Sequence, residues 1–501
     1  MQNPGDHDYN LQVSSSFHFE QRITFDAENA VELLREVPTL PGVFALRGER
    51  ASDQPYLTQA ADLRRRMVRL LAPPESQSKR LNLRDKVRSI EYTTTGSAFE
   101  SSLVLYDATS SIFGHVEARR RLRLNTPFFL RLTMERAHPR VYSTNRLSQS
   151  GLAHTYGPFS SRATAERYCD AVLDLFKLRR CFEDLDVHPD HPGCVYGEMK
   201  KCMAPCNASC TAEEYAAEAR AVQLFFDTHG ESMLGEIMLE RERASAEMEF
   251  ERAAELHLQH QRVKAAAVLA DELVRPLLKL RAVIVQAAAR RGGDANEGSE
   301  AAVFLLEGGC LLGPERLSTL GVRAVKEQTS VGSSLFAQPL MLQAVPLEGD
   351  SVTEMAPAAS TFHSPELRAE GVLGRLTSKA KSDNDLAGVS DHLSLLRRWY
   401  YRPEKQRAGE IFFPNSDGSW PIRRILRGAA RIALGEPKAM AETQRDLVAA
   451  AENRILHEGR EGIERVVPVA KGAGRGRKTR AKDSSPQTPE SPQLPAPRAT
   501  D

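Results

Sequence analysis

The sequence lacks any segment that is expected to enter or cross a membrane. Its N-terminus, MQNPGDHDYN, is polar and does not have the cationic-then-apolar order of a signal peptide. The most apolar long stretch, residues 265–289, cannot span a bilayer because five charged side chains interrupt it: Asp271, Glu272, Arg275, Lys279 and Arg281. We therefore expect a cytoplasmic protein with no membrane partner.

A strong net charge is lacking too, since 67 Lys and Arg offset 66 Asp and Glu to leave a net charge of +1. This balance excludes a strong electrostatic field around the whole molecule. The charge is uneven, however, because residues 60–150 contain 17 Lys and Arg against 8 Asp and Glu, with dense runs at 64–66 and 119–121. Such a patch suits phosphate backbones; an arginine-rich solvated face is the alternative.

Cysteine is scarce, with seven in 501 residues, yet five lie within positions 181–210. Thiols gathered in a reducing cell indicate metal ligands rather than disulfides. Zinc sites usually have close cysteine pairs at both ends, so the irregular spacing suits an iron–sulfur cluster such as [4Fe–4S] at least as well. Chance clustering is the third alternative, Cys210 is a spare thiol, and Cys169 is assigned to the core. The expected ligands are Cys181, Cys194, Cys202 and Cys206.

The order of helical and extended patterns indicates an α/β multidomain protein, and the length allows two to four domains. An N-terminal α/β module of roughly 100 residues comes first. Its expected elements are a helix from residue 30, a turn at 38–42 with a strand after it, a strand from 55, a basic helix at 60–71, a helix-like segment at 80–88, a strand at 89–96, a helix at 97–113, and strands at 128–135 and 140–144.

Further along, residues 154–160 predict a turn before a helix that Ser160 or Ser161 caps. Residues 211–268 are mostly helical in pattern, and two helices joined around Met248 and Phe250 would form an antiparallel hairpin. A strand pair joined across residues 308–309, a helix at 390–402 and a turn at 417–418 follow, and we assign Trp420 and Ile422 to the core.

Taken in order, these features resemble the UvrC family of the bacterial UvrABC excinuclease and the related Cho nuclease, over about residues 30–270. LPGVFAL and YLTQAADLRRR stand in the place of the two GIY-YIG motifs. TYGPFSSRATAE and LFKLRRC resemble the turn and helix that lead to the family's first cysteine, and KKCMAPC ends the quartet. MEFERAAELH resembles the UVR motif, a helical hairpin that pairs with the UvrB component of the excinuclease.

The resemblance implies a GIY-YIG nuclease module that hydrolyses one phosphodiester with Mg²⁺ or Mn²⁺. It assigns catalytic roles to Tyr56 and Arg66, and the helix would aim Arg66 back toward Tyr56. Phe44 replaces the first motif's tyrosine, Thr58 replaces a glycine, and Leu105 replaces the metal-binding glutamate. These departures support a second hypothesis, a DNA- and partner-binding module with a weakened or inactive nuclease site.

The resemblance also implies that the cysteine quartet holds an iron–sulfur cluster, with zinc as the alternative. It implies nucleotide excision repair as the function, with damaged double-stranded DNA and a UvrB-like protein as partners. The expected DNA contacts are Arg64, Arg65, Arg119, Arg120 and Arg121, and the expected partner face of the hairpin is Phe250, Ala253 and Ala254. An RNase H-like nuclease and a helix–hairpin–helix pair are not recognisable between residues 332 and 501.

These assignments predict a chain divided into eight parts. They are a leader at 1–29, a GIY-YIG-like module at 30–145, a cysteine-rich iron–sulfur region at 146–215, a UVR-like helical hairpin at 216–270, a helix plus β-hairpin region at 271–345, a linker at 346–390, a C-terminal α/β segment at 391–465, and a disordered basic and proline-rich tail at 466–501.

Overall fold

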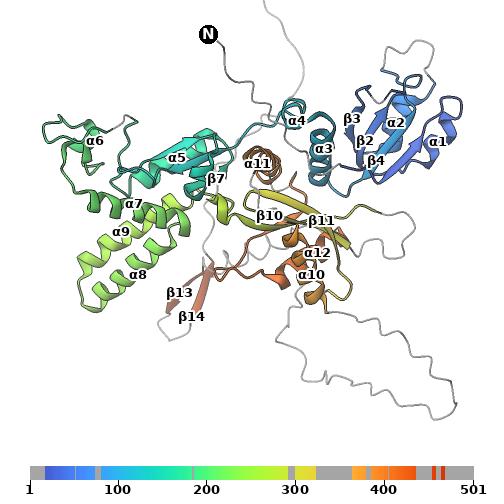
Figure 1. Cartoon of the computed structure of the whole chain (residues 1–501). Helices are drawn as coiled ribbons and strands as arrows, with labels where there is room; N and C mark the ends of the chain where they lie inside the picture. The colour runs from blue at the N-terminus through green and yellow to red at the C-terminus, as the bar shows by residue number, and fades with distance from the viewer. Residues whose placement is uncertain are drawn as a thin grey trace, which may run out of the picture. The chain divides into compact units, whose positions relative to one another are not determined.

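The computed structural model describes residues 17–50, 52–73, 81–182, 185–290, 300–322, 364–379, 385–403 and 406–435, and the backbone of two strands near the C-terminus. The chain divides into two units, Met1–Glu436 and Pro437–Asp501. In the second unit, β13 (Arg454–Glu458) pairs antiparallel with β14 (Glu464–Pro468). The first unit holds three four-stranded antiparallel sheets and the helices that cover them, which confirms a mixed α/β composition (Figure 1).

The first sheet has the order β1–β4–β2–β3, formed by β1 (Gln21–Thr24), β4 (Ser89–Thr94), β2 (Gly42–Arg47) and β3 (Tyr56–Ala60). Helices α1 (Ala30–Glu36) and α2 (Leu63–Leu71) bury Leu34, Leu63 and Met67 against it. Gly42 allows β2 to approach β4 closely, because a Cβ there would lie 2.4 Å from the Thr93 carbonyl oxygen. Since β1 is a strand of this sheet, part of the expected leader belongs to the module.

The helix-like segment expected at 80–88 is wrong for the residues that the structure describes, 81–88, which form a turn and extended chain. The Asn82 side chain explains the difference. Its oxygen accepts from the Arg84 N–H and its amide donates to the Ala72 carbonyl, so a local side-chain turn replaces the helix.

The second sheet has the order β6–β5–β7–β8, formed by β6 (Val141–Thr144), β5 (Phe128–Leu132), β7 (Thr155–Phe159) and β8 (Arg275–Pro276). The expected boundary between residues 145 and 146 therefore passes through a sheet, because β5 pairs with both β6 and β7. The turn expected at 154–160 is mostly strand β7; its Gly157–Pro158 step lies where the register of β5 shifts, so turn-forming residues mark a bulge instead.

Helices cover the second sheet and extend from it. The predicted cap is confirmed, since the Ser161 hydroxyl accepts from the Thr164 N–H at the start of α5 (Arg162–Leu173). Cys169 on α5 is buried in the core, as predicted. After the cysteine-rich segment come α7 (Ala212–Thr228), α8 (Glu231–Ala246) and α9 (Phe250–Ala267), and the last two form the predicted antiparallel hairpin (Figure 1).

The third sheet has the order β11–β10–β9–β12, formed by β11 (Cys310–Ser318), β10 (Glu300–Glu307), β9 (Arg281–Ala287) and β12 (Glu410–Phe412). Both faces are covered, and β10 alternates between them. Val303 and Leu305 face a core shared with α10 (Pro365–Ser378) and α12 (Ile422–Leu434). Phe304 and Leu306 face a core shared with α3 (Ala98–Phe113) and α11 (Leu386–Tyr400).

Two expectations for this region are wrong. The α-helix expected within 271–345 is not formed in the described residues of that range, which hold strands and one short 3-10 turn, because the apolar run RAVIVQA forms a strand that is buried between its two end residues. The range expected as a linker, 346–390, contains α10, which the Ser364 hydroxyl caps, and the start of α11. Trp420 and Ile422 pack on the core as predicted, and the strand pair across residues 308–309 is confirmed.

No helix in the described part of the chain combines the length and the apolar character that a membrane crossing requires.

Candidate functional site

Tyr56 and Arg66 are brought together by the edge strand β3 and the helix that follows it. The Asp62 carboxylate accepts from the Arg65 N–H and starts α2, which places Arg66 one helical turn into the helix. From there the Arg66 guanidinium donates to the Tyr56 hydroxyl across 3.0 Å, and both side chains are half-buried. Phe44 is fully buried beside Tyr56, with ring centroids 6.3 Å apart. The predicted proximity of Tyr56 and Arg66 is confirmed.

The two arginines that precede Arg66 differ in what they contact. Arg64 donates to the carbonyl oxygens of Val37 at 2.6 Å and Arg35 at 2.8 Å, at the end of α1, so it holds the two helices together. Arg65 is exposed. Its backbone N–H donates to Asp62, and its side chain forms no hydrogen bond or ion pair with the described residues. Of the expected DNA contacts on α2, Arg65 is the one whose side chain faces solvent.

No carboxylate among the described residues forms an ion pair or hydrogen bond with Arg66 or Tyr56. Leu105 lies on α3, which contacts β2 and β3. Glu100, five residues earlier on the same helix, is buried and accepts from the Gly96 N–H at 2.7 Å. Burial raises the pKa of Glu100 to about 7, although the Gly96 hydrogen bond and Arg316 lower it. The residues around Tyr56 and Arg66 therefore do not fit a divalent cation, which prefers ionised carboxylate ligands.

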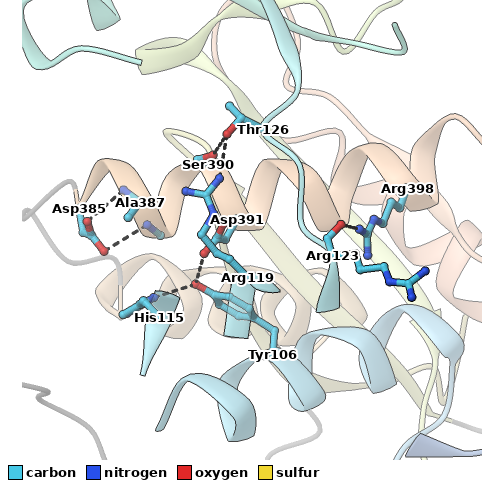
Figure 2. Close-up of polar contacts among 11 residues, drawn as sticks. Tyr106, His115, Arg119, Arg123, Thr126, Asp385, Ala387, Ser390, Asp391 and Arg398 are labelled. Carbon is cyan, nitrogen blue, oxygen red and sulfur yellow. Dashed lines mark hydrogen bonds and ion pairs between the residues drawn. The ribbon is translucent and has the colours of Figure 1, made fainter. Parts of the chain in front are cut away.

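Arg119, expected to contact DNA, instead joins two distant parts of the chain (Figure 2). It lies on α4 (His115–Leu122), and its Nε is 3.1 Å from Oδ1 of Asp391, a fully buried residue of α11. Tyr106 of α3 donates to the other oxygen of Asp391 at 3.1 Å, and Arg119 also donates to Thr126 at 2.9 Å. Burial raises the pKa of Asp391, and Arg119 and Tyr106 oppose the shift. Arg119 and Asp391 are 272 positions apart in the sequence, and no local pattern indicates this ion pair.

Arg120 and Arg121 share one carboxylate. Both donate to Glu117 of the same helix, at 2.7–2.9 Å, and Arg121 also lies over the Phe113 ring. A hollow of about 590 Å³ opens beside them at the end of α4. It is lined by Val116, Arg119, Arg120, Arg123, Leu124 and Asn125. Arg123, which sequence reasoning passed over, is exposed at the left-handed C-cap of α4.

The four expected cysteine ligands lie on short turns between α5 and α7. Cys194 precedes the one-turn helix α6 (Val195–Glu198), and Cys206 lies in a 3-10 turn. Cys202 lies between them, and burial raises the pKa of its thiol to about 11; the charges of Cys194, Cys181 and Cys206 add to that shift. The four thiols are thus close enough to act on one another electrostatically.

Hydrogen-bond donors point at two of these sulfurs. The Ala204 N–H donates to the Cys202 sulfur at 3.3 Å, and the Arg179 guanidinium donates to the Cys181 sulfur at 3.7 Å. N–H donors and a nearby cation stabilise thiolate, the form that binds metals. In the described residues, however, no group of three or more His, Cys, Asp or Glu side chains is arranged as a closed metal site. The donor set fits an iron–sulfur cluster in chemistry and number.

The helical hairpin exposes apolar side chains at its turn and along α9. Met248 at the turn and Phe250 at the start of α9 are 75% and 71% exposed. Ala254, one turn after Phe250, is exposed, and Leu258, one turn further, is 56% exposed. Ala253 packs instead against the core of the second sheet. Of the predicted partner face, Phe250 and Ala254 are therefore exposed and Ala253 is not. Leu258 lies on the same side of α9, because it follows them at the i, i+4, i+8 spacing.

Comparison with known proteins gives a family match that covers the second sheet and the cysteines. Residues 128–225 match the family model described as the middle domain of the UvrC/Cho excinuclease. That range begins at β5, contains all four expected ligands and ends within α7.

Curated relatives agree with this match. The UvrABC system protein C of Desulforudis audaxviator is 29% identical over 297 residues, which cover 58% of this chain and 45% of that protein. The proteins of the same name from Carboxydothermus hydrogenoformans and Actinobacillus succinogenes are 27% and 28% identical, over 45% and 46% of this chain and 36% and 38% of their own. Over these aligned residues, the chain is similar to UvrC/Cho proteins.

This UvrC/Cho-like chain spans less than half the length of the curated relatives that it matches. No solved structure matches it. The identity to the three relatives named above is 27–29% over the aligned part.

Proposed function

We propose that this UvrC/Cho-like protein takes part in nucleotide excision repair by binding damaged double-stranded DNA together with a UvrB-like protein, and that its N-terminal module binds the DNA backbone without cutting it. The observation that carries this proposal is the Tyr56–Arg66 pair, in which Arg66 meets a hydroxyl and, among the described residues, no carboxylate. Its positive charge is therefore available to a phosphate.

The Tyr56–Arg66 site has donors for a phosphate but no anionic ligand for a cation among the described residues. Arg66 would neutralise one non-bridging phosphate oxygen, and the Tyr56 hydroxyl, which accepts from Arg66, still has its own proton to donate. Hydrolysis by the family's chemistry uses a divalent cation that polarises the phosphate and activates water. With Leu105 at the position of the metal-binding glutamate, that chemistry should be slower by orders of magnitude.

Cleavage of one phosphodiester remains the second candidate function. It is favoured by the 3.0 Å contact between Tyr56 and Arg66, since the two side chains that the family uses at the phosphate are still held together. In that case Mg²⁺ or Mn²⁺ would have to be held by ligands that include the DNA itself.

Binding of a labelled damaged duplex by the full chain tests the proposal. Replacing Arg66 by Ala removes one phosphate contact, so affinity should fall about 5- to 10-fold near 0.15 M salt and the slope of log K against log salt should decrease by about one. Tyr56→Phe is the matched control, since it keeps the ring and should weaken binding less. Equal binding by wild type and Arg66→Ala would contradict a phosphate contact at this site.

We further propose that Cys181, Cys194, Cys202 and Cys206 hold an iron–sulfur cluster, which would tie the segment after α5 to the start of α7. The donors on the Cys202 and Cys181 sulfurs support this assignment over free thiols. Anaerobically purified protein should be brown, with an absorbance band near roughly 400 nm that Cys202→Ser removes. Colourless protein with one tightly bound zinc would support the zinc alternative instead.

The hairpin is proposed as the contact for the UvrB-like protein. Exposed Phe250, Ala254 and Leu258 form one apolar stripe, the pattern by which a helix docks on a partner helix. Phe250→Asp should abolish co-purification with that partner. Val31→Asp, at an exposed apolar position on α1, should leave it unchanged. Co-purification that survives Phe250→Asp would rule out this face.

A further inference from the structure

Helix α12 has one apolar side and one side that carries arginines. Its apolar side, which includes Ile425, Leu426 and Ala429, is buried against the third sheet. All of its charged residues are arginines, and none is acidic. Arg423 and Arg424 are exposed and Arg427 is half-buried, so three cations lie within two turns of one helix.

The fourth arginine of α12 forms an ion pair within the protein. Arg431 donates to both oxygens of Glu410 on β12, at 2.7–3.2 Å. By contrast, no carboxylate in the described residues pairs with Arg423, Arg424 or Arg427; Arg427 donates through Nε to the Arg423 carbonyl. Among the described residues, the two other guanidinium nitrogens of Arg427 form no hydrogen bond or ion pair.

Two of the acidic groups on neighbouring elements have other partners. On α10 and β11, Glu315 pairs with Arg375 and Lys379, and the Asp417 carboxylate in the loop before α12 accepts from Ser419. Glu370 lines the groove between α10 and α12, beside Trp420. The outer face of α12 therefore stays positively charged.

This arrangement opposes the stability of α12. Arg423 and Arg424 lie in the first turn, where the helix dipole is positive and where no acidic residue is present. Arg423 and Arg427 are four residues apart, the spacing at which like charges repel on a helix. Each of these effects lowers the stability of the helix slightly. An anionic partner would reverse both effects.

We propose that the outer face of α12, formed by Arg423, Arg424 and Arg427, binds the phosphodiester backbone of nucleic acid. This inference rests on the proposed function, in which the chain binds DNA, and adds a second contact surface to the one at Arg66. Long, flexible arginines on one helical face suit evenly spaced phosphates, and they hold the backbone without reading its sequence. Figure 1 shows α12 beside α10, on the third sheet.

The test compares two double charge reversals in the full chain. Arg423→Glu with Arg424→Glu changes α12; Arg220→Glu with Arg262→Glu makes the same charge change at exposed positions on α7 and α9. The α12 variant should bind a labelled duplex at least about 10-fold more weakly near 0.15 M salt, with a salt slope lower by about two. The control should bind within about 2-fold of wild type.

Each other outcome has a defined meaning. If wild type binds, Arg66→Ala weakens binding and the α12 variant binds like the control, the α12 proposal is wrong and the proposed function stands. If wild type does not bind DNA, both are wrong. If the α12 variant keeps its DNA affinity but loses binding to polyglutamate, the surface serves an acidic protein segment and the proposal is overturned. An unchanged circular dichroism spectrum and a melting temperature that does not fall exclude unfolding as the cause.

Discussion

Two arginine-rich helices of the first unit, α4 and α12, use the same residue type in opposite ways. On α4, Arg119 reaches the buried Asp391, and Arg120 and Arg121 share Glu117. On α12, three of four arginines have no carboxylate partner among the described residues. The comparison teaches that a run of arginines does not by itself indicate a phosphate site. An arginine that lies close to a carboxylate in the fold pairs with it. An arginine without such a neighbour keeps its charge for an external anion.

The largest expected effect is a loss of folding stability when Arg119 of α4 is replaced. Arg119→Met leaves the Asp391 carboxylate buried with only the Tyr106 hydrogen bond, so the free energy of unfolding should fall by about 3–4 kcal/mol. The matched control is Arg120→Met, at an exposed ion pair, which should leave the free energy of unfolding nearly unchanged. Denaturant titration measures both.

A double replacement sharpens this prediction. Arg119→Met with Asp391→Leu removes both charges and should restore most of the lost stability, because an apolar pair of similar volume can replace a buried ion pair. If Arg119→Met alone were as stable as wild type, Arg119 would be free for DNA and the contrast with α12 would disappear.

The second prediction concerns the buried carboxyl of Glu100, on α3 beside α4. Since burial raises its pKa to about 7, the folded protein keeps a proton that the unfolded chain loses near pH 4.3. The stability from this group is therefore full at low pH and is lost as the pH rises toward 7. Glu100→Gln should raise the free energy of unfolding at pH 8 by up to about 3 kcal/mol and flatten its pH dependence between about pH 5 and 7.

The control for this pH effect is Glu117→Gln, whose carboxylate lies on the solvent side of α4. It should not flatten the pH dependence in that interval. Identical pH profiles for wild type and Glu100→Gln would show that Glu100 is ionised in the folded state.

The smallest expected effect lies on α12. Arg423→Glu and Arg424→Glu place acidic residues in its first turn, so each should stabilise the protein by about 0.3–1 kcal/mol at low salt. The same changes should weaken DNA binding, so stability and binding would move in opposite directions. Thermal melts at two salt concentrations check this prediction; a loss of stability would mean that these arginines have structural partners.

Local sequence patterns predicted several parts of the fold and site. The family resemblance assigned Tyr56 and Arg66 to one site, and the helix after β3 was expected to aim Arg66 back toward Tyr56, as the structure shows. The α8–α9 hairpin followed from helical periodicity around Met248. Cys169 was assigned correctly to the core because it lies on the apolar side of α5.

What the sequence could not predict depends on contacts between distant segments. The pairing of Arg119 with Asp391 has no local pattern, and it diverts an arginine from the expected DNA surface. Ala253 was placed on the partner face, but it is partly buried against the core of the second sheet. Residues 154–160 have turn composition and still form a strand, because β5 and β8 offer hydrogen bonds on both sides.

The most direct test of the central claim, that this UvrC/Cho-like protein binds the DNA backbone without cutting it, is a nicking assay on an end-labelled damaged duplex. Anaerobically purified protein is incubated with Mg²⁺ or Mn²⁺, with and without the UvrB-like protein, beside Arg66→Ala. We expect salt-sensitive binding and no nick under any of these conditions. A nick made by wild type and lost in Arg66→Ala would contradict it and establish a working nuclease site at Tyr56 and Arg66.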